Sequence, residues 1–171
     1  MNPKVSVVIV AHNRWSYISQ CLDSLQRNTD YPCMEIVVVD NASTDETKER
    51  LSACRQQNVK PVVLHENAGF AAGVSAGCRA ALGDILILLN NDTIVPPGWI
   101  FRLLRPLLEH TDIGMAGPMT NVADDGQTVD FFIGDSVRGA DRRWLNDFYL
   151  FNKGSFRYTD FLAFFCVAGS L

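Results

Sequence analysis

The sequence predicts an α/β fold in which a mainly parallel β-sheet is flanked by helices. Short apolar runs alternate along the chain with segments whose apolar residues recur at helical spacing, which is the pattern of successive βαβ units. Polar residues follow directly after three of the apolar runs. In open parallel sheets, ligands bind at the carboxyl ends of the strands, so these polar residues are expected to converge on one site.

The first strand and helix have clear signals. Val5–Ala11 is rich in β-branched residues, as expected of a strand buried on both faces, and polar residues 12–14 follow it. From Ser16 to about Asn28, the apolar residues fall at helical spacing and predict a helix with one buried face, namely Ile18, Leu22 and Leu25.

The second and third units are shorter. Residues 36–39 predict a strand that ends in polar residues 40–41. Ser43 and Glu46 have the spacing of a capping box, so a helix is expected from about Thr44. A short strand over residues 62–64 and a turn over residues 67–69 follow.

The remaining elements begin with an alanine-rich helix. This helix is expected over residues 70–82, although Gly73 and Gly77 lower its helix propensity. Residues 85–89 predict a buried strand that stops at polar residues 90–92. A helix from Trp99 to Leu108 comes next, with Pro106 expected to bend its axis. Further strands are expected over residues 113–116 and 161–167, and residues 168–170 are expected to form a turn.

Composition excludes several classes of function. The chain has 171 residues, a net charge of −4 and 15 Lys and Arg against 19 Asp and Glu, which disfavours nucleic acid as a partner. Five widely spaced cysteines without a C-x-x-C pair disfavour a zinc ribbon, a redox motif or a disulfide scaffold. No apolar stretch reaches the length of a transmembrane segment, and the first residues lack the features of a signal peptide, so a cytoplasmic location is expected.

The polar cluster of residues 90–92 suggests a metal site. Glycine-rich phosphate-binding motifs are absent, but a diphosphate can instead be held through a hard divalent cation, which prefers carboxylate oxygens. Asp92 supplies such a group at the end of a strand, and Asn91 beside it offers a neutral amide. By itself, however, an Asn-Asn-Asp sequence is more typical of a loop with an Asx turn than of a metal site.

Four segments in order resemble the family 2 glycosyltransferases. These are VSVVIVAHNR at residues 5–14, EIVVVDNASTDET at 35–47, NAGFAAG at 67–73 and LLNNDT at 88–93, and the N-N-D-T sequence is most similar to the rhamnosyltransferase branch. The resemblance implies a GT-A fold, with a nucleotide-sugar-binding core over residues 1–119 and the start of an acceptor-binding part over residues 120–171.

The resemblance also implies roles for individual residues. Asp40 matches the carboxylate that recognises the base, and a carboxylate can accept a hydrogen bond from a pyrimidine N–H; a cap of the strand end is the less favoured alternative. Asp92 matches the ligand of Mg²⁺ or Mn²⁺. The other positions that match nucleotide-sugar contacts are Ala11, His12, Asn13, Asn41, Asn67, Gly69 and Asn91.

No catalytic residue is assigned within the chain. The acidic general base of inverting members is expected beyond Leu171, and the aspartates of the irregular segment are better read as solvated loop residues: Asp124, Asp125, Asp130, Asp135 and Asp160. Val74 and Ser75 stand where similar sequences usually have asparagines.

The expected function is therefore transfer of a sugar from a nucleoside-diphosphate donor, UDP or dTDP by resemblance, to the hydroxyl of a saccharide or lipid-linked acceptor. The reaction is expected to invert the anomeric centre, to depend on a metal and to serve polysaccharide or glycoconjugate synthesis. A non-catalytic fragment that binds the nucleotide sugar is the alternative, and a nucleotidyltransferase is a weaker one. The inner face of the membrane is an alternative location, and aromatic residues of the C-terminal third are expected to favour a homo-oligomer.

Overall fold

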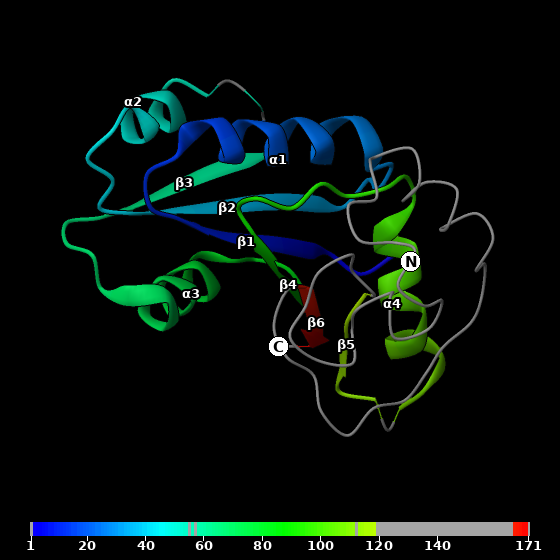
Figure 1. The fold of residues 1–171 in the computed structure, drawn as a ribbon. Coiled ribbons are helices and arrows are strands. Elements are labelled where there is room, and N and C mark those ends of the chain that lie inside the picture. Colours follow the sequence, from blue (N-terminus) through cyan, green and yellow to red (C-terminus); the bar gives the residue numbers. More distant parts are fainter. Residues whose placement is uncertain (1, 55, 57, 112, 119–165, 171) are drawn as a thin grey trace, which may run out of the picture.

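The chain forms a mixed sheet with helices on both faces (Figure 1). The computed structural model describes residues 2–54, 56, 58–111, 113–118 and 166–170. The strands are β1 (Val5–Ala11), β2 (Met34–Asn41), β3 (Val59–Leu64), β4 (Ile85–Asn90), β5 (Met115–Ala116) and β6 (Cys166–Ser170). The helices are α1 (Trp15–Asn28), α2 (Thr47–Ser52), α3 (Gly69–Ala80) and α4 (Trp99–Glu109). None of the described helices is long and apolar enough to cross a bilayer.

The strand order is β3-β2-β1-β4-β6-β5, and the first four of these strands are parallel. This confirms the predicted fold class. Strand β6 runs antiparallel to both of its neighbours. In the parallel part, Ala11 lies opposite Asp40, and Val10 lies opposite Asn90. The polar residues that follow β1, β2 and β4 therefore meet at one edge of the sheet.

The alternation of side chains along β1 divides the core between the two faces of the sheet. Val7 and Ile9 point to the face covered by α1 and α4, where Leu51 of α2 also packs. Val8 points to the opposite face, which α3 covers. In Figure 1, α1 and α2 lie above the sheet and α3 lies below it.

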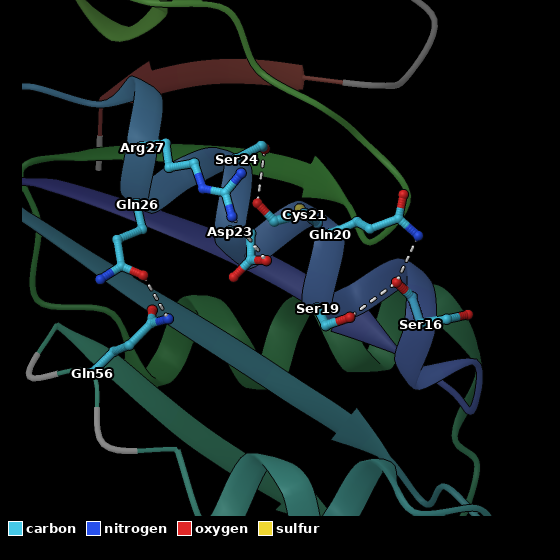
Figure 2. Close-up of polar contacts among 9 residues, drawn as sticks. All are labelled: Ser16, Ser19, Gln20, Cys21, Asp23, Ser24, Gln26, Arg27 and Gln56. Atoms are coloured by element: carbon cyan, nitrogen blue, oxygen red, sulfur yellow. Dashed lines mark hydrogen bonds and ion pairs between the residues drawn. The ribbon is translucent and has the colours of Figure 1, made fainter. Parts of the chain in front are cut away.

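Helix α1 is bonded to the rest of the protein on its buried side, and on its exposed side it has an ion pair between two of its own residues (Figure 2). On the buried side, the Ser24 hydroxyl donates to the Cys21 carbonyl (2.8 Å) and accepts the Val95 N–H (3.2 Å). On the exposed side, Arg27 pairs with Asp23 one turn earlier (3.7 Å). Exposed pairs of this kind contribute little stability, so burial holds the helix in place.

Helix α3 lies unusually close to the sheet. A Cβ atom at Gly77 would lie 2.3 Å from Val8 Cγ1, and one at Gly73 would lie 2.7 Å from Val10 Cγ1. The two glycines that lower the helix propensity of this segment are therefore explained by packing, because any larger residue would push α3 away from β1.

Polar groups close the amino-terminal edge of the sheet. The Ser6 hydroxyl (2.6 Å) and the Leu82 N–H (2.6 Å) both donate to Glu35 Oε1, and the Gly83 N–H donates to the Ser6 hydroxyl (2.8 Å). Burial alone would raise the pKa of Glu35, but these hydrogen bonds and the charges of Lys4 and Lys60 outweigh it and lower the pKa.

The predicted capping box is wrong. Helix α2 begins at Thr47 rather than Thr44, and the side chain of its N-cap residue, Glu46, makes no capping hydrogen bond; Asp45 Oδ1 instead accepts the Thr47 N–H (3.0 Å). The Ser43 hydroxyl instead accepts the Asn13 N–H (2.8 Å), while Glu46 pairs with Arg50 (3.1 Å). A long-range contact with the loop after β1 has replaced the local cap.

Three strand boundaries also differ. Strand β3 begins at Val59 and includes Pro61, which an edge strand tolerates because its outer N–H groups have no partner strand. Strand β5 is shorter than predicted. The turn predicted over residues 168–170 is wrong, because these residues belong to β6, where pairing with β4 on one side and β5 on the other overrides their weak strand propensity. Residues 161–165, the first part of the predicted last strand, lie outside the described residues.

Candidate functional site

A cleft of about 470 Å³ opens at the carboxyl ends of β1, β2 and β4. The residues that line it come from the strand ends, from the loop after β1 and from the start of α3: Val10, His12, Arg14, Asn41, Asn67, Phe70 and Asn91. Side chains from different parts of the sequence thus meet where an open α/β sheet is expected to bind its ligand.

Asn41 connects two of the loops around this cleft. The residue is 3% exposed, and its side-chain amide uses both ends. Its Oδ1 accepts the Ala68 N–H (3.0 Å), and its Nδ2 donates to Asn67 Oδ1 (3.0 Å) and to the Gly69 carbonyl (3.2 Å). The end of β2 is therefore tied to the loop that leads into α3.

The turn into α3 depends on Gly69. Its φ of +81° lies in the left-handed region, and its N–H donates to Asn67 Oδ1 (3.0 Å). A side chain at this position would be strained whatever space surrounds it. The turn places Phe70 at the wall of the cleft with 53% of its surface exposed.

Asn13 connects the loop after β1 to the loop after β2. Its side-chain Oδ1 accepts the N–H groups of Thr44 (2.7 Å) and Asp45 (3.3 Å). Beside it, His12, which also lines the cleft, donates from Nδ1 to the Asn41 carbonyl (2.9 Å). Together with the contacts of Asn41, these bonds hold three loops of the site against one another.

Asp40 lies at the end of β2, fully buried, directly before the cleft residue Asn41. Its Oδ1 accepts the Ser43 N–H (3.0 Å) and so caps the strand end, as the structural alternative expected. Its Oδ2 has no hydrogen-bond partner among the described residues. A buried acceptor without a partner costs about 1–3 kcal/mol, so Asp40 also retains one oxygen suited to a ligand N–H.

The end of β4 carries the predicted metal ligand. Asn91 lines the cleft, and Asp92 next to it is exposed in the turn closed by the Thr93 N–H and the Asn90 carbonyl (3.3 Å). Burial, together with the negative charge of Asp92, raises the pKa of Cys21 to about 12, so this thiol stays protonated and is no nucleophile.

The donor set around Asp92 fits a hard cation only in part. Within the described ranges, no group of three or more His, Cys, Asp or Glu side chains is placed to hold a metal. Mg²⁺ bound with a nucleotide commonly takes one or two carboxylates and completes its shell with phosphate oxygens and water. A single exposed carboxylate beside an open cleft fits that arrangement, so Asp92 is suited to a metal that arrives with a diphosphate.

The structure brings four of the predicted site residues into the cleft lining: His12, Asn41, Asn67 and Asn91. The others lie behind or beside the lining: Ala11, Asn13, Asp40, Gly69 and Asp92. Sequence reasoning missed Val10, Arg14 and Phe70 as lining residues, although all three stand inside motifs that were recognised. The acidic residues weighed as bases, and the aromatic residues of the predicted self-association surface, lie outside the described residues.

Known proteins are similar to this chain in sequence and in fold. The chain is 29% identical over 135 residues to the glycosyltransferase GlyG of Streptococcus pneumoniae serotype 4, an alignment that covers 78% of this chain and 44% of GlyG. It resembles the crystal structure of S. aureus TarS 1-349 in complex with UDP-GlcNAc with a TM-score of 0.62 and 26% identity, over 72% of this chain and 36% of TarS. It also resembles the mannosyltransferase PcManGT from Pyrobaculum calidifontis in complex with GDP-Man and Mn²⁺ with a TM-score of 0.60 and 26% identity, over 67% of this chain and 35% of PcManGT.

The chain therefore spans less than half the length of these relatives. The family description "Glycosyl transferase family 2" matches residues 6–166, which include the described helices, strands β2 to β5, all of β1 except Val5, and only the first residue of β6. The alternation of strands and helices, the cleft at the strand ends and these matches lead to one conclusion: the chain belongs to glycosyl transferase family 2.

Proposed function

We propose that the cleft binds the nucleoside-diphosphate part of a sugar donor and that the protein transfers the sugar, with inversion, to the hydroxyl of a saccharide or lipid-linked acceptor. The observation that carries the proposal is the convergence of His12, Asn41, Asn67 and Asn91 on one cleft. The neighbours bound to UDP-GlcNAc and GDP-Man support a nucleotide-sugar ligand.

The donor is proposed to be a UDP- or dTDP-sugar. Asp40 Oδ2, which lacks a partner, is the acceptor proposed for the ring N–H of the pyrimidine, and the amide of Asn91 is proposed to contact the ribose. His12 and Asn67 would complete the walls around the nucleoside. Ala11, Asn13 and Gly69 would act by shaping the backbone around the ligand, since their side-chain positions serve packing, loop contacts and a left-handed turn.

Asp92 is the residue proposed to hold Mg²⁺ or Mn²⁺. A bound divalent cation supplies positive charge that offsets the negative charge of the departing diphosphate. The Asp92 carboxylate itself anchors that charge at the end of β4, beside the cleft residue Asn91.

In the proposed reaction, the acceptor hydroxyl loses its proton to a carboxylate base and attacks the anomeric carbon, while the bond to the nucleoside diphosphate breaks. We propose that this base lies beyond Leu171. The shorter length of this chain relative to GlyG, TarS and PcManGT supports that placement.

Thermal shift measurements with UDP, dTDP, GDP and their sugars, each with and without Mn²⁺ or Mg²⁺, test donor binding, because a ligand of the folded state raises its apparent stability. We expect the pyrimidine nucleotides with metal to give the largest shifts. The absence of a shift with every nucleotide would reject the donor site. A preference for GDP would reject the proposed pyrimidine nucleotide. Measurable sugar transfer by the 171-residue chain alone would reject a base beyond Leu171.

Replacing Asp40 by Asn examines base recognition. The amide keeps an acceptor for the Ser43 N–H but loses the charged oxygen, so UDP should bind about tenfold or more weakly. Isothermal titration with UDP and GDP measures the change in the ratio of the two affinities. An unchanged ratio would leave Asp40 as a strand cap only.

A further inference from the structure

Arg14 is a cation in the cleft to which no role has been given so far. It is the only lysine or arginine in the cleft lining, and the lining contains no aspartate or glutamate among the described residues. Its side chain is exposed, and no described carboxylate forms an ion pair with it. The cleft therefore carries a positive charge that no carboxylate neutralises within the described part of the chain.

The backbone at Arg14 is strained, and contacts with the loop after β2 hold it in this conformation. Asn13 and Arg14 both adopt left-handed conformations, with φ values of +60° and +61°. Asparagine tolerates this region, whereas a residue such as arginine pays about 1–2 kcal/mol for it. The Asn13 side chain, bonded to the amides of Thr44 and Asp45, fixes the loop in this shape.

The Asp45 side chain makes a second contact with the backbone at Arg14. The pKa of the Asp45 carboxyl is lowered because the Thr47 side chain and the backbone amides of Thr47, Arg14 and Trp15 face it. Asp45 thus meets the amino-terminal end of α1 at Arg14. A strained non-glycine residue that is held by contacts from another loop is a position where side-chain function is expected to outweigh the strain.

The Arg14 side chain has a partner that orients it without neutralising it. The guanidinium carbon lies 6.0 Å from the centre of the Tyr17 ring, which is one turn along α1. A cation over an aromatic face keeps its charge and its N–H donors free for an anion.

We propose that Arg14 binds the phosphate groups of the donor and gives the cleft its preference for a diphosphate over a neutral nucleoside, with Asn13 as the positioning residue that holds the Arg14 backbone. This inference rests on the proposed function, since it assigns a contact within the donor cleft. A guanidinium matches phosphate oxygens with two parallel N–H donors. The proposed metal at Asp92 and the proposed cation at Arg14 would then approach the diphosphate from different strand ends, β4 and β1.

The test compares UDP with uridine by isothermal titration in excess Mn²⁺, using the 171-residue chain. Arg14→Gly suits the left-handed backbone, so the variant should unfold within a few degrees of the parent. We expect it to bind UDP about tenfold to a hundredfold more weakly while uridine affinity changes less than about twofold. Arg14→Lys, which keeps the charge but not the paired donors, should recover part of the loss.

Arg27→Ala is the matched control, because Arg27 lies at the other end of α1 and pairs with Asp23 (Figure 2). It should leave both affinities unchanged. Equal losses for UDP and uridine in Arg14→Gly, or an unchanged UDP affinity, would overturn the role of Arg14 while leaving the donor site intact. If the parent chain binds neither UDP nor uridine, the proposed function itself fails.

Discussion

Asn41 shows how a single residue of the cleft lining also holds the surrounding loops in place. Its amide needs both an acceptor and a donor end, because it accepts the Ala68 N–H and donates to Asn67 and Gly69. No other side chain of the same shape has both ends. Residues predicted as ligand contacts thus divide into those that face the cleft and those that keep the facing residues in place.

Asn41→Asp is expected to disrupt the loop before α3. The carboxylate can still accept from Ala68, but its second oxygen would face two other acceptors, Asn67 Oδ1 and the Gly69 carbonyl, to which it cannot donate. The cost is about 1–3 kcal/mol of the free energy of unfolding, with weaker UDP binding as a result. Urea unfolding measures the first and titration calorimetry the second. Asn58→Asp, in the exposed turn before β3, serves as the control, and a variant as stable as the parent would contradict the role of the amide.

Asp92→Ala is expected to separate binding from stability. The side chain is exposed in a turn and contributes little packing, so the melting temperature should stay close to that of the parent. Binding of UDP should lose its dependence on Mn²⁺. Calorimetry with and without the metal measures this, and Asp23→Ala on the exposed face of α1 is the matched control. Unchanged Mn²⁺-dependent affinity would remove Asp92 from the metal site.

Sequence reasoning succeeded for contacts that local pattern determines and failed for contacts made at a distance. The buried runs and the polar strand ends predicted the parallel sheet and the edge that carries the cleft. The partner of Ser43 could not be predicted, because Asn13 lies 30 residues away. Residues 168–170 belong to a strand only because β4 and β5 pair with them from both sides.

At the scale of the element, α3 is the helix whose position matters most for the cleft. It begins at Gly69, directly after the loop held by Asn41, and it approaches β1 through Gly73 and Gly77. Neither glycine is needed for a positive φ. Their small size lets the helix settle onto the valines of the sheet, and its first turn then presents Phe70.

Gly77→Ala is expected to destabilise the protein although alanine favours helices. The new Cβ would lie 2.3 Å from Val8 Cγ1, and the resulting overpacking costs about 1–3 kcal/mol. Combining it with Val8→Ala should cost less than the sum of the two single changes, because the clashing methyl group is gone. Urea unfolding of the four proteins measures this coupling.

Gly114→Ala is the matched control for that series, because a Cβ there meets nothing within 4 Å. Full additivity of Gly77→Ala and Val8→Ala would contradict the proposed steric contact.

At the scale of the whole molecule, the two edges of the sheet differ in what they do with polar groups. At the carboxyl edge, the polar side chains surround an open cleft. At the amino edge, Glu35, Ser6 and the amides of Leu82 and Gly83 satisfy one another. One edge is arranged for a ligand and the other for stability. Variants at the carboxyl edge should therefore change ligand affinity, and variants at the amino edge should change the stability of the fold.

Glu35→Gln tests this separation through pH. The pKa of Glu35 is lowered in the folded protein, so its charge adds stability at any pH above the unfolded value of about 4.3 and loses that effect as the pH falls through the folded value. Glutamine keeps the acceptor but not the charge. The melting temperature of the parent should therefore exceed that of the variant most above about pH 5, and the gap should close as the pH falls through the lowered pKa of the folded protein.

UDP affinity at neutral pH should be the same in Glu35→Gln and the parent, because Glu35 lies at the edge opposite the cleft. Glu49→Gln on the exposed surface of α2 controls for the loss of one negative charge. A gap in melting temperature that does not vary with pH would show that the charge of Glu35 adds nothing.

Val10 belongs at once to the wall of the cleft and to the surface on which Gly73 rests. A methyl group added at Gly73 would press on the Val10 side chain, 2.7 Å from its Cγ1. The space offered to a donor can therefore be adjusted from α3, on the face of the sheet to which Val10 points. For anyone who wishes to alter which sugar nucleotide fits, the pair Gly73 and Val10 is a place to work without replacing any polar residue of the site.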